Sequence, residues 1–198
     1  DIVTTAGAVG DFVGALQTLP GTASNADDGR LFVRGGSAEE TQIFIDGSRV
    51  FRPFLPTTGN IPTRGRFSPF LFDGITFSTG GYSAEYGDAL SSVLLLNTND
   101  FPKEEKTELG IMTIGGNFGK TKIWGKNSIS VNAQYVNLAP YNEVISQNNQ
   151  FKKPFQSLNT EAVYRHEFDK GLFKAYSAYS YSDFAIIQED IDVEEGFY

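Results

Sequence analysis

The segment LFVRGGSAEETQIFIDGSRV, residues 31 to 50, places two short apolar runs on either side of a polar break that contains two glycines. In the second run Ile43 and Ile45 alternate with their neighbours, which is the period-2 pattern of a β-strand. Asp46-Gly47 follows at once and predicts a hairpin turn, because glycine tolerates the positive φ that such a turn requires. The segment therefore predicts a small sheet.

An amphipathic helix is predicted before this segment. Asp11 can cap it and Pro20-Gly21 ends it. Further strands are expected at residues 74–78 and 93–97, so the first half of the chain predicts a compact sheet with a helix packed on it. The helix has its apolar residues on one face, namely Phe12, Ala15, Leu16 and Leu19.

Two polar segments divide the chain further. Residues 51–66, FRPFLPTTGNIPTRGR, hold too many prolines and glycines for a regular element and predict a long loop. Residues 100–106, DFPKEEK, have the polar, proline-containing composition of a domain boundary. We therefore expect a first domain up to about this point and a second one after it.

The second half is dominated by long alternating strands. With the short segment KTKIWG included there are about five, joined by the short turn FDKG and the long loop NLAPYNEVISQNNQFKKP. Strands of about 10 residues with alternating short and long connections are typical of outer-membrane barrels. The strands of soluble antiparallel sandwiches show the same alternation of apolar and polar side chains, so this pattern alone leaves both folds open. Since even small barrels close with about eight strands, five strands cannot close a barrel alone. The clearest alternation is found in residues 109–114, 128–135, 158–168 and 173–181.

Composition excludes several classes of protein. The net charge of −8 excludes a nucleic-acid-binding surface, and the absence of Cys excludes disulfides and thiolate chemistry. No apolar run approaches the roughly 18 residues of a membrane-spanning helix. No nucleophile with a base is recognisable, since Asp46 and Asp73 both precede glycine as turn residues do. Neither end has the pattern of a complete terminus, so we expect the chain to continue on both sides.

Four segments resemble, in their order, the plug domain of TonB-dependent outer-membrane receptors. The resemblance covers about half the chain, and four ordered motifs are more specific than any single one. It implies an α+β plug domain, with a small mixed sheet and short helices, over residues 1–102. Antiparallel strands of a truncated transmembrane β-barrel would follow over residues 103–198. The segments are ALQTLPGT (15–22), GRLFVRGG (29–36), TQIFIDGSRV (41–50) and GGYSAEYGDALSSVLLLNT (80–98).

The resemblance implies transport rather than catalysis, without a cofactor. It implies a receptor in the outer membrane of a Gram-negative bacterium that imports an iron chelate, cobalamin, glycan or peptide through a plugged barrel. The implied partners are the TonB complex of the inner membrane, an extracellular small-molecule or oligomeric substrate and outer-membrane lipid, with a surface lipoprotein as a further candidate. The alternative is a secreted, adhesin-like β-sandwich that binds without transport.

Candidate site residues follow from charge and position. The arginines around the long loop could form a positively charged mouth for an anionic ligand, and the alternative is that they are solvated or face the barrel wall. Arg34, in the Arg-Gly pair typical of plugs, is expected to latch onto carboxylates of the barrel wall, with Glu85 in the turn that packs against that wall. His166 is the only histidine, so a His-based metal site is not expected. The candidate ligand-binding residues are Arg49, Arg52, Arg64, Arg66, Phe54 and Tyr141.

Overall fold

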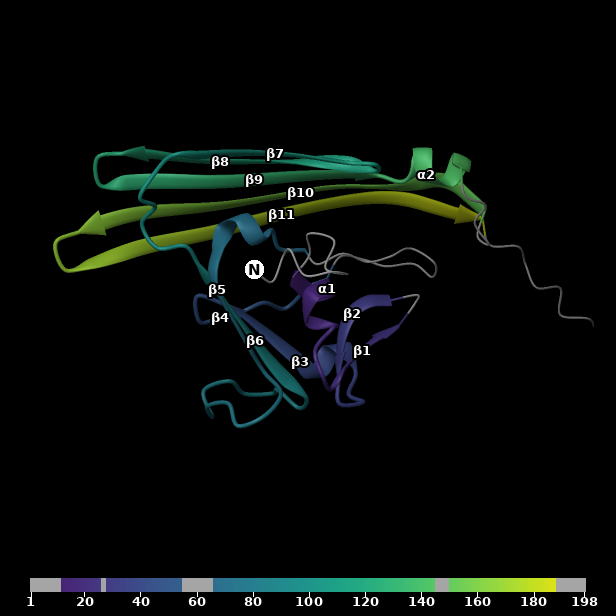
Figure 1. The fold of residues 1–198 in the computed structure, drawn as a ribbon, viewed down its shortest axis with the longest axis horizontal. Coiled ribbons are helices and arrows are strands. Elements are labelled where there is room, and N and C mark those ends of the chain that lie inside the picture. The colour runs from purple at the N-terminus through teal and green to yellow at the C-terminus, as the bar shows by residue number, and fades with distance from the viewer. Residues whose placement is uncertain (1–11, 26–27, 55–65, 145–149, 188–198) are drawn as a thin grey trace, which may run out of the picture.

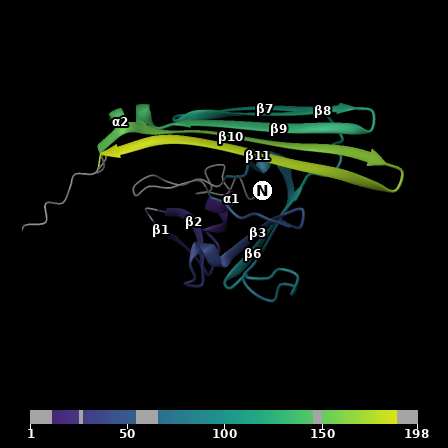
Figure 2. The same ribbon diagram turned by 180° about the vertical axis from the view of Figure 1, so that it is seen from behind.

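The computed structural model describes residues 12–25, 28–54, 66–144 and 150–187. Two parts lie against each other (Figures 1 and 2): a compact N-terminal unit, the plug, and a long five-stranded sheet, the wall, which passes across one side of it. None of the described helices has the length and apolar character needed to cross a membrane.

The plug is built on a four-stranded mixed sheet with the order β4-β3-β6-β5. Strand β3 (Thr41–Ile45) pairs in parallel with β6 (Ser92–Thr98) and antiparallel with the two-residue β4 (Ser48–Arg49). Strand β5 (Phe72–Ser78) pairs antiparallel with β6. This confirms the predicted small sheet and the strands expected at residues 41–45, 74–78 and 93–97.

Short elements surround this sheet. Helix α1 (Phe12–Leu16) ends before the predicted Leu19, because the chain turns at Thr18. Strand β2 (Asp28–Val33) is longer than predicted and pairs with β1 (Thr22–Asn25), which its polar sequence did not predict. The remaining elements are the 3-10 turns η2 (Ala38–Glu40) and η3 (Pro69–Leu71).

The predicted hairpin turn at Asp46-Gly47 is confirmed. Asp46 and Gly47 have φ values of 46° and 80°, the left-handed region that Asp tolerates and glycine favours. The Asp46 carboxylate also accepts hydrogen bonds from the backbone N–H and hydroxyl of Thr98, at 2.9 and 2.5 Å. The turn is thus tied to the end of β6.

One hydrophobic core joins the plug elements and reaches the wall. It contains α1, β2, β3, η3, β5 and β6, because each of these turns its apolar residues inward. Val163, from the wall, is fully buried in the same cluster, and Tyr176 packs against it. Plug members include Phe12, Leu16, Leu31, Val33, Ile43, Leu71, Leu94 and Leu96.

The wall is an antiparallel sheet in which each strand pairs with the next along the chain. Its sheet order is β11-β10-β9-β8-β7, and it is open at both edges. The short helix α2 (Ala139–Val144) lies in the loop between the third and fourth strands. The strands are β7 (Lys106–Met112), β8 (Gly115–Trp124), β9 (Asn127–Asn137), β10 (Gln150–Phe168) and β11 (Gly171–Ile187).

Three details of the wall correct the sequence prediction. Strand β8 is not short, because the glycine-rich GGNFG pairs with β9 as fully as KTKIW does. Strand β10 begins at Gln150 rather than near Leu158, and α2 was not predicted. The number of strands, about five, is confirmed.

The two faces of the wall differ in chemistry, as the period-2 pattern predicts. On β9 the buried Ser128, Ser130 and Asn132 face the plug, whereas Tyr135 on the other face is 45% exposed. We call the second face the outward face. It carries exposed large apolar side chains, among them Leu109, Ile111, Phe118, Trp124, Tyr135, Leu158, Phe173, Tyr179 and Tyr181. The wall is therefore polar toward the plug and apolar outward.

Candidate functional site

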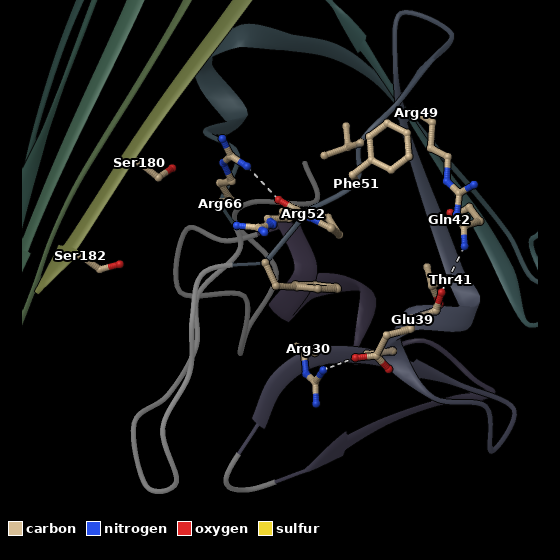
Figure 3. A pocket seen from close by; sticks show the side chains of 14 residues that line it. Arg30, Glu39, Thr41, Gln42, Arg49, Phe51, Arg52, Arg66, Ser180 and Ser182 are labelled. Atoms are coloured by element: carbon tan, nitrogen blue, oxygen red, sulfur yellow. Dashed lines mark hydrogen bonds and ion pairs between the residues drawn. The ribbon is translucent and has the colours of Figure 1, made fainter. Parts of the chain in front are cut away.

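A pocket of about 710 Å³ lies between the plug and β11. Its plug side is formed by β2, β3 and the segment that continues from β4, and its wall side by Ser180 and Ser182 of β11 (Figure 3). Four of the six predicted ligand-binding residues line it, namely Arg49, Arg52, Arg66 and Phe54, together with Arg30 and Phe51. The structure therefore brings together four predicted ligand-binding residues that span 17 positions of the sequence, from Arg49 to Arg66.

Two of these arginines are neutralised within the plug. Arg30 pairs with Glu39, and Arg49 Nη1 lies 3.0 Å from Asp88 Oδ2. Arg49 also lies over the ring of Phe51. These two side chains shape the pocket but contribute little net positive charge to it.

Arg52 and Arg66 differ from them. Neither forms an ion pair within the part of the chain that the structure describes. Arg66 Nη1 donates to the backbone carbonyl of Arg52 at 2.8 Å, which holds the two residues together (Figure 3). With Phe54 beside them and the hydroxyls of Ser180 and Ser182 opposite, these guanidinium groups suit an anionic ligand.

The other two predicted ligand-binding residues lie elsewhere. Arg64 falls outside the described residues. Tyr141 lies on α2, 38% exposed, in the loop between β9 and β10, and is not among the residues that line the pocket. The roles of both residues stay predictions.

The predicted latch residues are both exposed on the plug. Arg34 has a φ of 51°, and with Gly35 at 77° it forms the turn after β2. Glu85 lies in the turn before β6, where the hydrogen bond to its carboxylate raises the pKa of the Tyr86 hydroxyl. Neither side chain has an ion pair to the described strands of the wall. Their latch role stays a prediction. The Arg-Gly pair also forms the turn after β2, in which both residues have positive φ angles.

The described contacts between plug and wall come from other residues. Arg165 of β10 is fully buried, and its Nε donates to the carbonyl oxygen of Asn99, just after β6, at 2.6 Å. Its Nη1 donates to Ser130 Oγ on the neighbouring strand at 2.9 Å. A charged side chain of the wall is thus bonded to the backbone at the end of the plug.

Lys174 of β11 reinforces the same junction. Its Nζ donates to the Thr98 carbonyl oxygen at 2.9 Å and lies 2.8 Å from Asp100 Oδ1 and 3.9 Å from Asp46 Oδ1. The hydrogen bond and positive charge of Lys174 lower the pKa of Asp100. At this junction the cations belong to the wall and the carboxylates to the plug, the reverse of the arrangement predicted for Arg34.

A third contact uses a wall carboxylate. Glu161 of β10 is 3% exposed, and its two oxygens accept from the Ser68 backbone N–H at 2.8 Å and the Tyr176 hydroxyl at 2.7 Å. Ser68 caps η3, so this bond fixes the plug segment that follows Arg66. Phe70 of η3 lies close to Gly119 on β8, so close that a Cβ atom there would meet the ring at 3.2 Å.

The sequence pattern could have identified Arg165, Lys174 and Glu161 as residues that contact the plug, because they lie on the polar face of their strands. Each interrupts an alternating strand at a position on the polar side, in register with the serines and asparagines that face the plug. The plug partners of Arg165 and Glu161 are backbone atoms, which carry no residue signal, whereas Lys174 also meets the carboxylates of Asp100 and Asp46. Among the described residues, no group of three His, Asp or Glu side chains lies close enough together to hold a metal ion.

Comparison with known proteins identifies the first half of the chain. Residues 3–93 match the family model of the TonB-dependent receptor plug domain. A comparison with curated proteins gave no match. The matched range contains helix α1, strands β3, β4 and β5 of the mixed sheet, the start of β6 and all the plug residues of the pocket described above. The chain therefore carries a TonB-dependent receptor plug domain in its first half.

Proposed function

We propose that the protein is a TonB-dependent receptor of the outer membrane of a Gram-negative bacterium, in which residues 103–198 form the first strands of the barrel wall around the plug. The observation that carries this proposal is the difference between the two faces of the wall. A polar face against a plug and an apolar, aromatic outward face are what a barrel strand in lipid requires. The family match supports this function over the secreted adhesin-like alternative.

The pocket supports the transport of an anionic substrate. Arg52 and Arg66 are the arginines of the pocket that form no described ion pair, although the charge of Arg66 also acts on Glu161 of β10, and the apolar ring of Phe54 lines the same pocket. Serine hydroxyls from β11 complete the pocket, so a ligand there would touch the plug and the wall together. Release into the periplasm would then require the TonB complex to move the plug away from the wall.

Cysteine labelling in the complete receptor tests the membrane placement. Val131→Cys and Ala133→Cys place the thiol on the outward face, and Asn132→Cys and Gln134→Cys place it on the face toward the plug. In intact outer membranes the outward thiols should react with a lipophilic maleimide and resist a water-soluble one. Rapid reaction of Val131→Cys with the water-soluble reagent would contradict a lipid-facing surface, and a receptor that sediments without membrane would contradict the location.

A further inference from the structure

The outward face of the wall contains a pair of lysines on β8 among mostly apolar neighbours. Lys120 and Lys122 of β8 are both exposed, and Thr121 between them is buried toward the plug. Strand pairing places Lys120 beside Val131 and Lys122 beside Ile129, with Ala162 and Tyr164 in the next strand. From the Trp124 row to the Tyr135 row, no other position of the paired strands on this face holds Lys, Arg, Asp or Glu, and the acidic residue next to these rows is Glu105, which directly precedes β7 opposite Lys122.

No described carboxylate neutralises this pair. Neither lysine forms an ion pair or a side-chain hydrogen bond within the described part of the chain. Glu105, which directly precedes β7, accepts from the Ile123 backbone N–H at 3.1 Å and forms no described ion pair with either lysine. Two like charges two residues apart on one strand face therefore have no described ion pair, and the single carboxylate beside them, Glu105, is bonded to the backbone.

The position of the pair relative to the strand ends indicates its environment. Lys122 lies two residues from Trp124, which ends β8 at a short turn, and the turn between β10 and β11 is at the same end of the sheet (Figure 1). Short turns lie on the periplasmic side of outer-membrane barrels. Trp124 and Tyr164 have ring centroids 6.4 Å apart, and such amphipathic rings prefer the level of lipid headgroups.

We propose that Lys120 and Lys122 form a binding site for the phosphate of an anionic phospholipid in the periplasmic leaflet. This inference rests on the proposed function, since it places the outward face in the membrane. The flexible lysine stems can direct both ammonium groups toward the headgroup level, where the cost of a charge in lipid becomes small. The phosphate lies between the two cations, and the acyl chains follow the apolar surface of Val131, Ala133 and Phe118.

Native mass spectrometry of the complete receptor tests this site, with phosphatidylglycerol and phosphatidylcholine as probes. The wild type should retain phosphatidylglycerol about tenfold over phosphatidylcholine. The double variant Lys120→Gln/Lys122→Gln should lose this preference, whereas the matched control Lys103→Gln/Lys152→Gln, which alters exposed lysines elsewhere, should keep it.

Each other outcome overturns the inference in a recognisable way. An unchanged preference in the Lys120/Lys122 variant means that the lysines only extend toward water. An equal loss in the control means a general charge effect, and competition by millimolar inorganic phosphate means a site for free phosphate. The same variants are also tested for outer-membrane location, so that a receptor absent from the membrane, which contradicts the proposed function, is distinguished from a membrane receptor without lipid preference.

Discussion

Arg165 Nε and the carbonyl oxygen of Asn99 are 2.6 Å apart, which places a buried wall cation on the backbone where the plug ends. Of the described charged contacts between the two parts, this is the one whose side chain is wholly removed from solvent. A buried hydrogen bond to a charged group is worth more than one at the surface, because water cannot replace it. The junction between plug and wall is therefore sensitive to changes at this residue.

Replacing Arg165 should loosen the plug. Arg165→Ala removes the bonds to Asn99 and Ser130 and leaves a cavity, so we expect a loss of about 3 kcal/mol in the free energy of unfolding. Thermal unfolding of the complete receptor and protease cleavage between residues 99 and 106 measure it. Arg165→Lys keeps the positive charge but not the geometry of the guanidinium group, so its stability should lie between those of the wild type and Arg165→Ala. Equal protease resistance in all three proteins would contradict the assigned contact.

The contact between Lys174 and Asp100 should depend on pH. The pKa of Asp100 is lowered in the folded protein, so its stabilising contribution is present above the ordinary aspartate pKa of about 3.9 and is lost as pH falls through the folded value. Protease cleavage at the junction should therefore increase in acid more steeply in the wild type than in Asp100→Asn. Asp73→Asn, which alters an exposed aspartate on β5, serves as the control and should behave as the wild type.

Gly119 should tolerate no larger side chain. A Cβ at this position meets three ring atoms of Phe70 at 3.2 Å, so Gly119→Leu should push η3 away from β8 and cost about 1–3 kcal/mol in stability. The melting temperature of the complete receptor measures the effect. Combining Gly119→Leu with Phe70→Ala should restore part of the loss. A double variant less stable than the sum of both single variants would argue against this contact.

The arginines of the pocket should differ in their effect on anion binding. Arg52→Gln and Arg66→Gln remove cations that form no described ion pair, whereas Arg30→Gln and Arg49→Gln each remove one that is already in an ion pair. With citrate as a probe, the anion-dependent rise in melting temperature should fall in the first two variants and persist in the second two. A uniform response of all four variants would show that only the net charge matters.

The sequence predicted the polar and apolar faces of the wall strands and the core of the plug better than it predicted the contacts between plug and wall. Alternation identified the polar and apolar sides of β9, β10 and β11, because the side-chain period of a strand is fixed at two. The full length of β8 was missed, since GGNFG has too few side chains to show alternation. Strand β1 was missed because TASN is polar and becomes a strand only by pairing with β2.

The candidate site was predicted only in part, because the sequence shows which residues cluster along the chain but not which residues meet in the fold. The arginines in and next to residues 51–66 were recognised by their clustering, and three of them, Arg49, Arg52 and Arg66, line one pocket. Which arginines are neutralised was not predictable, since Glu39 and Asp88 come close only in the folded plug. Ser180 and Ser182 are far away in the sequence and are chemically inconspicuous.

Val163, a residue of the wall, completes the hydrophobic core of the plug. This β10 side chain is fully buried in the same apolar cluster as Leu71 and Leu96, and Tyr176 packs beside it. A newly made plug therefore displays an apolar surface until the fourth wall strand arrives, and its folding reaches completion only together with the sheet around it. Assembly is thus expected to be a concerted process, in which a chain that has paired its wall strands wrongly also has an unfinished plug that proteases can recognise.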